Sequence, residues 1–185
     1  MRIISGNFKG KKIIQPKDNL TRPLKDLTKE SIFNIINHSK KVKFDIKNST
    51  VLDLFAGVGS FGIECLSRGV KHVVFYENYD GVLPILKKNL KSLKNLENFQ
   101  IIENDIYAKN SFLSLSLKFN IIFLDPPYKD KNVKLLLSRL KNSNIIDPDG
   151  IIILHRNKNE KIEIPNNYEI IEERKYGISK ILFLN

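Results

Sequence analysis

Four consecutive residues, Asp125-Pro126-Pro127-Tyr128, bring together groups that could hold a planar base. They follow the apolar run 119–124, which is typical of a buried strand that stops at the proline pair. Open α/β sheets bind ligands at the carboxyl ends of their strands, so Asp125 is expected at such an edge. Prolines have a fixed φ and no N–H, so we expect a stiff loop whose carbonyls are free to accept hydrogen bonds.

The chemistry that this tetrapeptide could perform is the recognition of an exocyclic amino group. The carboxylate of Asp125 and the carbonyl of Pro126 are two acceptors for N–H groups, and the ring of Tyr128 can stack on a base. An ordinary turn is the simpler interpretation of the same residues. We therefore treat the tetrapeptide Asp125, Pro126, Pro127 and Tyr128 as the candidate catalytic site.

A glycine-rich loop forms the second candidate site. Gly57, Gly59 and Gly62 have G-x-G-x-x-G spacing and lie between a predicted strand, 50–55, and a predicted helix, 60–68. Glycines at this point allow a tight turn and a close approach of the backbone to a ligand. Glu77 ends the next predicted strand, 20 residues after Gly57, which is the spacing expected for an acid that binds ribose hydroxyls. The combination favours a cofactor that contains adenosine.

Two cofactors fit this loop, and an acidic residue before it distinguishes them. NAD would place a pyrophosphate at the start of the helix, whereas S-adenosylmethionine has no phosphate and carries a cationic tail. Asp53, four residues before Gly57, would attract an ammonium group and repel a pyrophosphate, which favours S-adenosylmethionine. A carboxylate satisfied within the fold at the strand end is the structural alternative for Asp53.

A third acid, Asp105, follows the predicted strand 98–103. Its carboxylate could accept a hydrogen bond from an adenine amino group, or it could cap a helix that begins at Ile106. The predicted cofactor site consists of Asp53, Phe55, Gly57, Gly59, Glu77 and Asp105.

Bulk properties limit the class of protein. The chain has 185 residues and is 42% hydrophobic, which suits one domain with a sizeable core. No apolar stretch approaches the ~18 residues that span a bilayer, and the first residues do not resemble a signal peptide. A single cysteine fits a reducing compartment, so we expect a cytoplasmic protein. His38, His72 and His155 have no metal-binding spacing, and we assign them no chemistry.

The positive charge is concentrated at the N-terminus. Residues 1–43 contain eleven Lys or Arg against three acids, so they carry +8 of the net charge of +11. Such a basic segment is typical of proteins that bind nucleic acid. A compositional bias towards Lys, Asn and Ile is the alternative, although a uniform bias would not concentrate the charge in the first quarter of the chain.

The elements that must position these residues alternate between strand and helix from residue 50 onwards. This order predicts a doubly wound α/β fold with a mostly parallel sheet. Two final strands joined at Gly177 predict an antiparallel C-terminal pair. We expect strands at 50–55, 71–77, 98–103, 119–125, 150–155, 168–176 and 178–184, and helices at 25–37, 60–68, 80–94, 106–117 and 131–141. Residues 1–43 form a predicted β-hairpin and helix extension, and 44–185 the cofactor-binding domain.

Taken together, these residues resemble those of the bacterial small-subunit ribosomal RNA guanine-N2 methyltransferases. The resemblance extends over Met1–Gly6, Lys9–Lys12, Arg22-Pro23, Asp26, Glu30, Phe33-Asn34, Asp53–Gly59, Leu66–Gly69, Asp125–Tyr128 and Tyr176-Gly177. The N-terminal blocks are specific to that family, whereas many amino-group methyltransferases share the glycine loop and the tetrapeptide. Leu24 and Leu27 stand where the family usually has Thr and Arg, which leaves the role of their helix open.

The resemblance implies transfer of a methyl group from S-adenosylmethionine to the N2 atom of a guanine in 16S ribosomal RNA, with guanine 966 as the target. It implies a Rossmann-like, seven-stranded sheet, a monomer, and ribosomal RNA or a partly assembled small subunit as the partner. The implied RNA-binding residues are Arg2, Lys9, Lys11, Lys12 and Arg22. Arg22 could instead contact the tail of the cofactor.

Three other functions remain compatible with parts of the sequence. A DNA adenine-N6 or cytosine-N4 methyltransferase uses the same tetrapeptide, although the chain has little room for a target-recognition domain. A dinucleotide-dependent oxidoreductase shares the sheet, but Asp53 argues against it and no hydride-transfer partner is placed. A non-catalytic RNA-binding module would explain the basic segment and leave both ligand loops without a purpose. Fold alone does not separate these functions.

Overall fold

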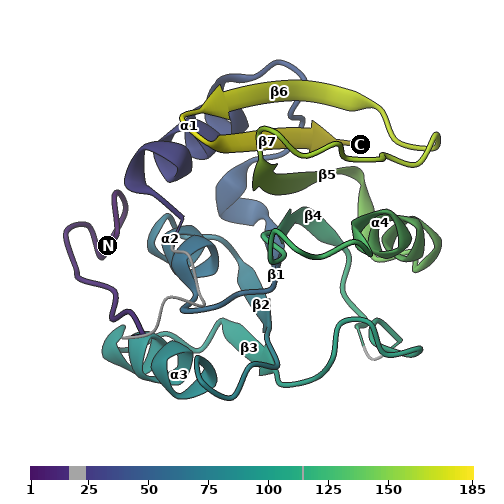
Figure 1. Cartoon of the computed structure of the whole chain (residues 1–185). Helices are drawn as coiled ribbons and strands as arrows, with labels where there is room; N and C mark the ends of the chain where they lie inside the picture. The colour runs from purple at the N-terminus through teal and green to yellow at the C-terminus, as the bar shows by residue number, and fades with distance from the viewer. Residues whose placement is uncertain (17–23, 114) are drawn as a thin grey trace.

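The computed structural model describes residues 1–16, 24–113 and 115–185. Within them the strands form one seven-stranded sheet in the order β3-β2-β1-β4-β5-β7-β6 (Figure 1). The strands are β1 (Thr50–Leu54), β2 (His72–Tyr76), β3 (Phe99–Ile102), β4 (Phe119–Leu124), β5 (Ile146–Asn157), β6 (Ile170–Tyr176) and β7 (Ser179–Leu184). The first five strands are parallel, and β7 lies antiparallel between β5 and β6. This confirms the predicted doubly wound, mostly parallel sheet with an antiparallel strand at its C-terminal end.

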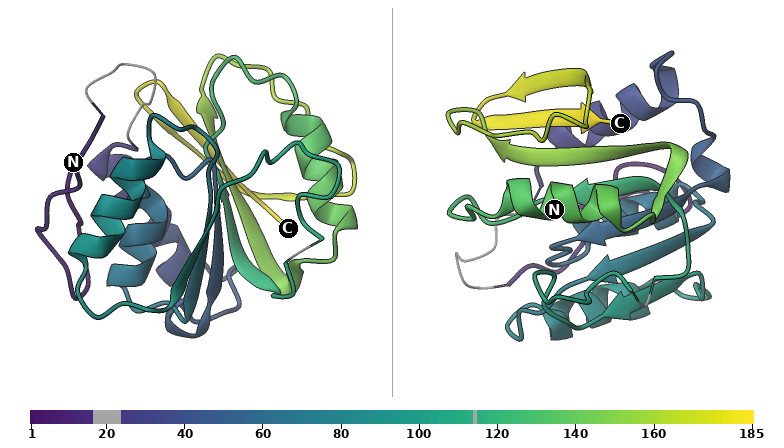
Figure 2. Two further views of the ribbon diagram at one scale, coloured as in Figure 1. Left: turned by 90° about the horizontal axis from the view of Figure 1, so that it is seen from below. Right: turned by 90° about the vertical axis from the view of Figure 1, so that its right-hand side faces the viewer.

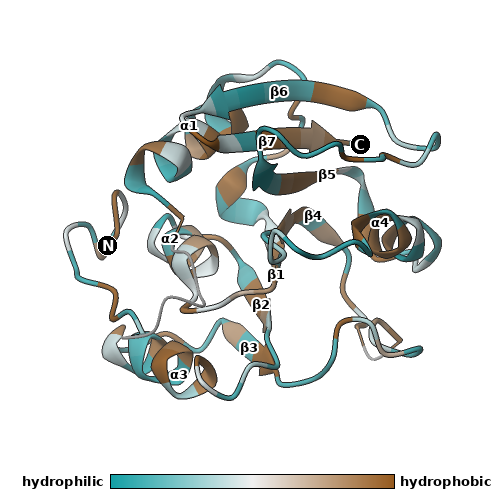
Figure 3. Ribbon diagram, in the orientation of Figure 1, coloured by the Kyte–Doolittle hydropathy of each residue, from teal (hydrophilic) through white to brown (hydrophobic). Residues whose placement is uncertain are grey.

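Helices cover both faces of this sheet. Helices α1 (Asp26–His38), α2 (Ser60–Ser67) and α3 (Leu83–Ser92) lie on one face, and α4 (Val133–Asn142) lies on the other (Figure 2). Two clusters of buried apolar side chains fill the two layers between helices and sheet. Central parallel strands buried on both faces are mainly apolar, and Figure 3 shows an apolar stretch in β4 and in the middle of β5, whose end is hydrophilic. The apolar run predicted the position of β4 closely, whereas β5 extends beyond the predicted 150–155 into polar residues at both ends.

The helix predicted at 106–117 is wrong. Among its described residues the chain makes successive turns, with Ser111 N donating to Ala108 O and Leu113 N to Asn110 O. Ile106 and Phe112 are the buried apolar residues, and their spacing of six does not match one face of a helix. Short polar side chains in this segment also compete for backbone hydrogen bonds.

The predicted N-terminal hairpin is present in a short form: an isolated antiparallel bridge joins Arg2 and Lys12, and backbone hydrogen bonds from Ile3 N to Lys11 O and from Ile13 N to Met1 O join the two arms, although they form no named strands. The backbone of this segment also makes hydrogen bonds to α2. Ile4 N and Ser5 N donate to the two carboxylate oxygens of Glu64 at 2.8 and 2.9 Å, and Asn7 N donates to Ser67 O at 2.7 Å. Backbone groups that bond to a neighbouring helix are not available for a longer ladder between the two arms.

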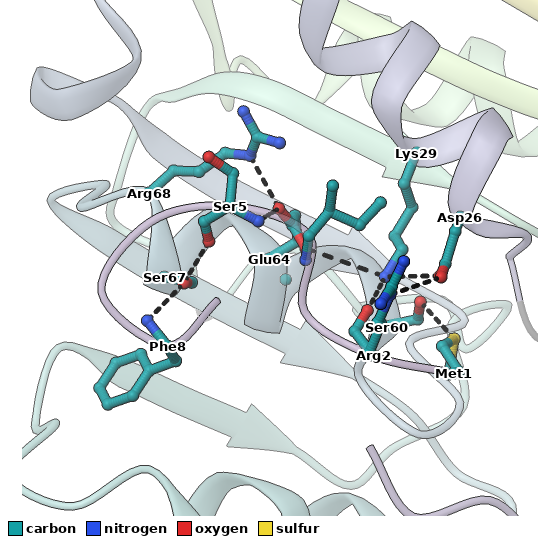
Figure 4. Close-up of polar contacts among 12 residues, drawn as sticks. Met1, Arg2, Ser5, Phe8, Asp26, Lys29, Ser60, Glu64, Ser67 and Arg68 are labelled. Atoms are coloured by element: carbon teal, nitrogen blue, oxygen red, sulfur yellow. Dashed lines mark hydrogen bonds and ion pairs between the residues drawn. The ribbon is translucent and has the colours of Figure 1, made fainter. Parts of the chain in front are cut away.

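A buried ion pair fastens this N-terminal segment and α1 to α2 (Figure 4). Lys29 of α1 and Glu64 of α2 are both 0% exposed, with Nζ and Oε2 3.8 Å apart, and Lys29 Nζ also donates to Arg2 O at 2.8 Å. Ile3 and Phe33 belong to the same apolar cluster as α2. The N-terminal extension is therefore packed into the core through both polar and apolar contacts.

No helix within the described ranges is long and apolar enough to cross a membrane.

Candidate active site

The register of the central strands brings the predicted site residues to one edge of the sheet. Leu54, the last residue of β1, pairs with Tyr76 of β2 and Leu124 of β4. The next residues along the chain are therefore neighbours at the carboxyl ends of three parallel strands, where α/β sheets bind ligands. This placement brings together the glycine loop, Glu77 and Asp125.

The glycine loop has a strained backbone. Phe55, Gly57 and Gly59 all have positive φ, at 59°, 56° and 83°. This conformation is unfavourable for Phe55, because its Cβ atom crowds the backbone there and a glycine has none. A Cβ atom on Gly59 would lie 2.6 Å from Leu86 Cδ1, so this glycine is required for packing against α3. A Cβ atom on Gly57 would meet nothing closer than 4.0 Å, so the loop is open at that point. Strain of this kind gathers at ligand sites.

Glu77 lies directly against the first glycine of the loop. Its Oε2 accepts from Gly57 N at 2.7 Å, and its Oε1 accepts from Asn78 N and Tyr79 N, each at 2.9 Å. The structure thus joins the two features whose spacing had indicated a ribose-binding acid. The fixed carboxylate is presented at the open part of the loop.

Asp53 is buried beneath the loop. Its side chain is 1% exposed, and Oδ2 accepts from Gly62 N at 2.9 Å in the first turn of α2. Burial raises the pKa of Asp53 well above its ordinary value, the hydrogen bond from Gly62 opposes the rise, and the charges of Asp125 and Glu77 add to it. This geometry favours the structural alternative for Asp53, and its contact with a cofactor tail stays a prediction.

Asp105 is exposed and caps a turn. Its Oδ1 accepts from Tyr107 N at 2.9 Å. Because residues 106–113 form turns and no helix, Asp105 caps a turn and not the helix that was one of its two predicted roles. Its other predicted role, binding the adenine amino group, stays a prediction. The ring of Tyr107 lies 6.1 Å from that of Phe55, between centroids, and its hydroxyl donates to Asp130 Oδ2 at 2.5 Å. Tyr107 thereby connects the glycine loop with the segment after the tetrapeptide, a role that the sequence analysis missed.

The tetrapeptide loop is held by hydrogen bonds from β5. Asp125 is partly accessible, with its side chain 21% exposed, and its Oδ1 lies 2.8 Å from His155 Nδ1. The carbonyls of Pro126 and Pro127 accept from Arg156 Nη1 at 3.1 and 2.7 Å. The prediction that these carbonyls are free is therefore wrong, although each carbonyl oxygen has a second lone pair.

His155 and Arg156 were assigned no role from the sequence. Because Leu124 of β4 pairs with Leu154 of β5, the residue after Leu154 must lie beside Asp125. That register was the signal that could have identified His155. The expectation that His155 carries no chemistry did not take into account its place beside Asp125 at the end of a parallel strand.

The predicted RNA-binding residues differ in solvent exposure and in whether their charged groups already have a partner within the protein. Arg2, Lys9 and Lys12 are exposed, and Arg2 Nε lies 3.5 Å from Asp26 Oδ2. Lys11 Nζ instead donates to Ser92 O, at the end of α3, which is a favourable place for a cation. Arg22 lies outside the residues that the structure describes.

The arrangement suits S-adenosylmethionine better than a dinucleotide. Glu77 and Asp105 present carboxylates at the sheet edge beside the open glycine, with buried Asp53 below. An acidic surface attracts a cationic sulfonium and ammonium and repels a pyrophosphate. A mixed seven-stranded sheet in this order, with a glycine loop after β1 and Asp-Pro-Pro-Tyr after β4, defines a Rossmann-like methyltransferase.

Comparison with known proteins identifies the family. The model of the family described as "Conserved hypothetical protein 95" matches residues 1–185, and the chain belongs to that family. The ribosomal RNA small subunit methyltransferase D of Haemophilus influenzae is 32% identical over 179 residues, covering 96% of this chain and 90% of its own. The protein of the same name from Buchnera aphidicola is 33% identical over 174 residues, covering 93% and 86%. The resemblance inferred from the sequence is confirmed.

Solved structures agree with the fold. A structure described as a methylase from Haemophilus influenzae has a TM-score of 0.76 at 31% identity, covering 100% of this chain and 97% of that one. The protein SMU.776, solved in complex with S-adenosylhomocysteine (SAH), is 15% identical with a TM-score of 0.63, covering 85% of this chain and 49% of that one. The chain is an S-adenosylmethionine-dependent methyltransferase, as its cofactor site had indicated.

Proposed function

We propose that this protein methylates the exocyclic N2 atom of a guanine in 16S ribosomal RNA, with guanine 966 as the target nucleotide. The observation that carries the proposal is the anchored, partly exposed Asp125 at the edge that also holds the glycine loop. The small-subunit specificity is supported by relatives of that name at 32% and 33% identity over most of the chain.

The chain's residues act mainly by orienting the base. S-adenosylmethionine supplies the electrophilic methyl group when it is bound. The lone pair of a guanine amino group is delocalised into the ring, so nucleophilicity is the difficulty. Asp125 accepts one N–H, which orients the nitrogen and stabilises the positive charge that develops on it in the transition state. The second lone pair of the Pro126 carbonyl accepts the other N–H, and Tyr128 stacks on the unpaired base.

The cofactor residues divide their tasks along the sheet edge. Glu77 accepts from the ribose hydroxyls, and Asp105 accepts from the adenine amino group. Asp53 acts from below, where it accepts a hydrogen bond from Gly62 N, and the cationic tail of the bound cofactor would favour its ionised form. Gly57 allows the backbone to approach the ligand because no side chain fills the space beside it.

The exposed cations of the N-terminal extension bind the RNA. Lys9, Lys12 and Arg2 lie on the surface of a segment that is fastened to α2, so phosphates held there are positioned relative to the active site. Phosphate contacts of this kind fix the orientation of the nucleic acid and carry no sequence information.

The test is methylation with labelled S-adenosylmethionine of naked 16S RNA and of partly assembled and complete small subunits, followed by nuclease digestion and mass mapping. We expect N2-methylguanosine at guanine 966. Large-subunit RNA and duplex DNA serve as controls. A label on adenine N6 or cytosine N4 of the DNA would overturn the RNA assignment, and a different methylated guanine would overturn the target nucleotide alone.

A further inference from the structure

We propose that His155 and Arg156, consecutive residues at the end of β5, are positioning residues that hold the Asp125–Tyr128 loop in its reactive geometry. The inference rests on the proposed function, because it gives both residues a part in the same methyl transfer. Neither residue needs to touch the base. Each acts through groups of the loop that do.

His155 fixes one oxygen of the Asp125 carboxylate. Its Nδ1 lies 2.8 Å from Asp125 Oδ1, and its Nε2 lies 2.9 Å from Ser179 Oγ of β7. An ionised carboxylate only accepts hydrogen bonds, so Nδ1 must carry a proton, both in the neutral ring and in the imidazolium. Asp125 Oδ1 thus accepts from His155, which leaves Oδ2 to accept from the base. The imidazole itself is buried and anchored by the hydroxyl of Ser179.

Arg156 fixes the backbone of the loop. Its Nη1 donates to Pro126 O and Pro127 O, and its Nη2 donates to Tyr128 O and Asp130 O at 3.0 and 3.2 Å. The remaining Nε lies 2.6 Å from Glu160 Oε2. Prolines restrict φ but leave ψ free, so the direction of each carbonyl needs a further constraint. A planar guanidinium with five donors supplies it, whereas a lysine ammonium would not have the same fork geometry.

The two residues grip the loop from opposite sides. Successive side chains of a strand point to opposite faces of a sheet. His155 therefore reaches the side chain of Asp125 from one face while Arg156 reaches the carbonyls from the other. Amine methylation depends on the alignment of a weakly nucleophilic lone pair with the methyl donor, and a misplacement of about 1 Å can cost roughly 10²-fold in rate. Fixing the acceptors in advance avoids that loss.

A purely structural role would show in stability and leave turnover by the folded protein unchanged, which is the distinction that the variants test. Arg156→Lys keeps the charge and removes the fork, and Arg174→Lys makes the same change at an exposed site on β6. We expect kcat to fall about 10- to 100-fold in Arg156→Lys. The dissociation constant of SAH should stay within a few fold, and Arg174→Lys should match the parent. An unchanged kcat in folded Arg156→Lys would overturn the role of Arg156.

The protonated nitrogen of His155 gives a readout that does not depend on activity. The chain has only three histidines, so 15N-histidine labelling with a His155→Gln variant assigns the ring signals directly. We expect a proton on Nδ1 of His155. A bare Nδ1, with the proton on Nε2 alone, would overturn the contact with Asp125. If the parent methylates no nucleic acid, the proposed function fails, and this measurement still decides the hydrogen bond.

Ser179→Ala provides a mild second variant for His155, because it removes the hydroxyl that holds Nε2 and leaves the imidazole in place. We expect a several-fold lower kcat at an unchanged SAH affinity. His155→Gln, which keeps a donor, should retain more activity than His155→Leu, which removes it. Equal turnover of His155→Leu and the parent would overturn the positioning role of the imidazole.

Discussion

Asp125 is anchored through one carboxylate oxygen and still reachable from solvent, which is the condition for a preorganised acceptor. We predict that Asp125→Ala lowers the rate of methyl transfer about 10²–10³-fold, as expected when one preorganised group is lost. SAH affinity should change by no more than a few fold, because the carboxylate acts on the base. Asp125→Asn, which keeps one acceptor oxygen, is the matched control. Calorimetry and single-turnover kinetics measure the two effects, and near-normal turnover of Asp125→Ala would exclude Asp125 from the mechanism.

Asp53 shows how burial at the same edge produces a pH dependence of stability. Burial raises its pKa in the folded protein above the ordinary value of 3.8, aided by the charges of Asp125 and Glu77 and opposed by the Gly62 hydrogen bond. The stability that Asp53 contributes is therefore fully present below pH 3.8 and is lost as the pH rises through its folded-state pKa. Each pH unit in that window changes stability by about 1.4 kcal/mol.

We predict that Asp53→Asn, which cannot ionise, becomes more stable relative to the parent as the pH rises from 3.8 through the folded-state pKa of Asp53. The difference in Tm should grow by roughly 3–6 °C per pH unit within the window, given the size of the chain. Differential scanning calorimetry across that range measures it. The exposed Asp80→Asn is the control, and a Tm difference for Asp53→Asn that does not change with pH would contradict the assigned burial effect.

At the scale of elements, Glu64 connects the N-terminal segment, α1 and α2. Its carboxylate accepts from Ile4 N, Ser5 N and Arg68 Nε, and it neutralises buried Lys29. We predict that Glu64→Leu costs about 3–5 kcal/mol, because it leaves a buried ammonium with less compensation and backbone N–H groups without an acceptor. Thermal unfolding should show a Tm lower by roughly 6–20 °C.

The exposed pair Lys134–Glu163 provides the comparison, since its Nζ–Oε2 distance is 2.7 Å and both side chains are more than half exposed. Glu163→Leu should leave the free energy of unfolding close to that of the parent, because ion pairs between exposed side chains contribute little to stability. A similar loss in both variants would mean that burial does not distinguish the two pairs and that the extension is held mainly by its apolar side chains.

The elements that could be predicted from the sequence are the buried strands, because their burial appears as a run of apolar residues. The strands β1 and β4 are mainly apolar because helices cover both faces of the sheet, and their predicted bounds agree with the structure within one residue. The turns at 106–113 could not be predicted in the same way, since Ile106 and Phe112 are buried by tertiary contacts without helical periodicity. The role of His155 was missed because its contact with Asp125 depends on β5 lying beside β4, and the order of strands in a sheet cannot be inferred from local sequence.

At the scale of the whole molecule, the positive charge and the acidic cofactor edge occupy different parts of one body. Residues 1–43 carry eleven of the 31 Lys and Arg, and the described part of this extension packs on the face that bears α2 and α3. The structure separates these cations by environment. Lys11 donates a hydrogen bond to the carbonyl of Ser92 at the C-terminal end of α3, whereas Lys9 and Lys12 are exposed. Charge counted from the sequence therefore overstates what is available to bind RNA.

We predict that Lys9→Gln and Lys12→Gln together weaken RNA binding and flatten its salt dependence. Each lost phosphate contact should lower the slope of log affinity against log salt by roughly 0.7–0.9, so two contacts lower it by about 1.4–1.8. SAH affinity should stay unchanged, because neither lysine belongs to the sheet edge. The matched control is Lys161→Gln with Lys175→Gln, which removes the same charge from exposed positions elsewhere. RNA affinity at several salt concentrations decides the matter: equal slopes in both double variants would mean that these lysines only solvate the surface, and that the charge of the extension reflects composition.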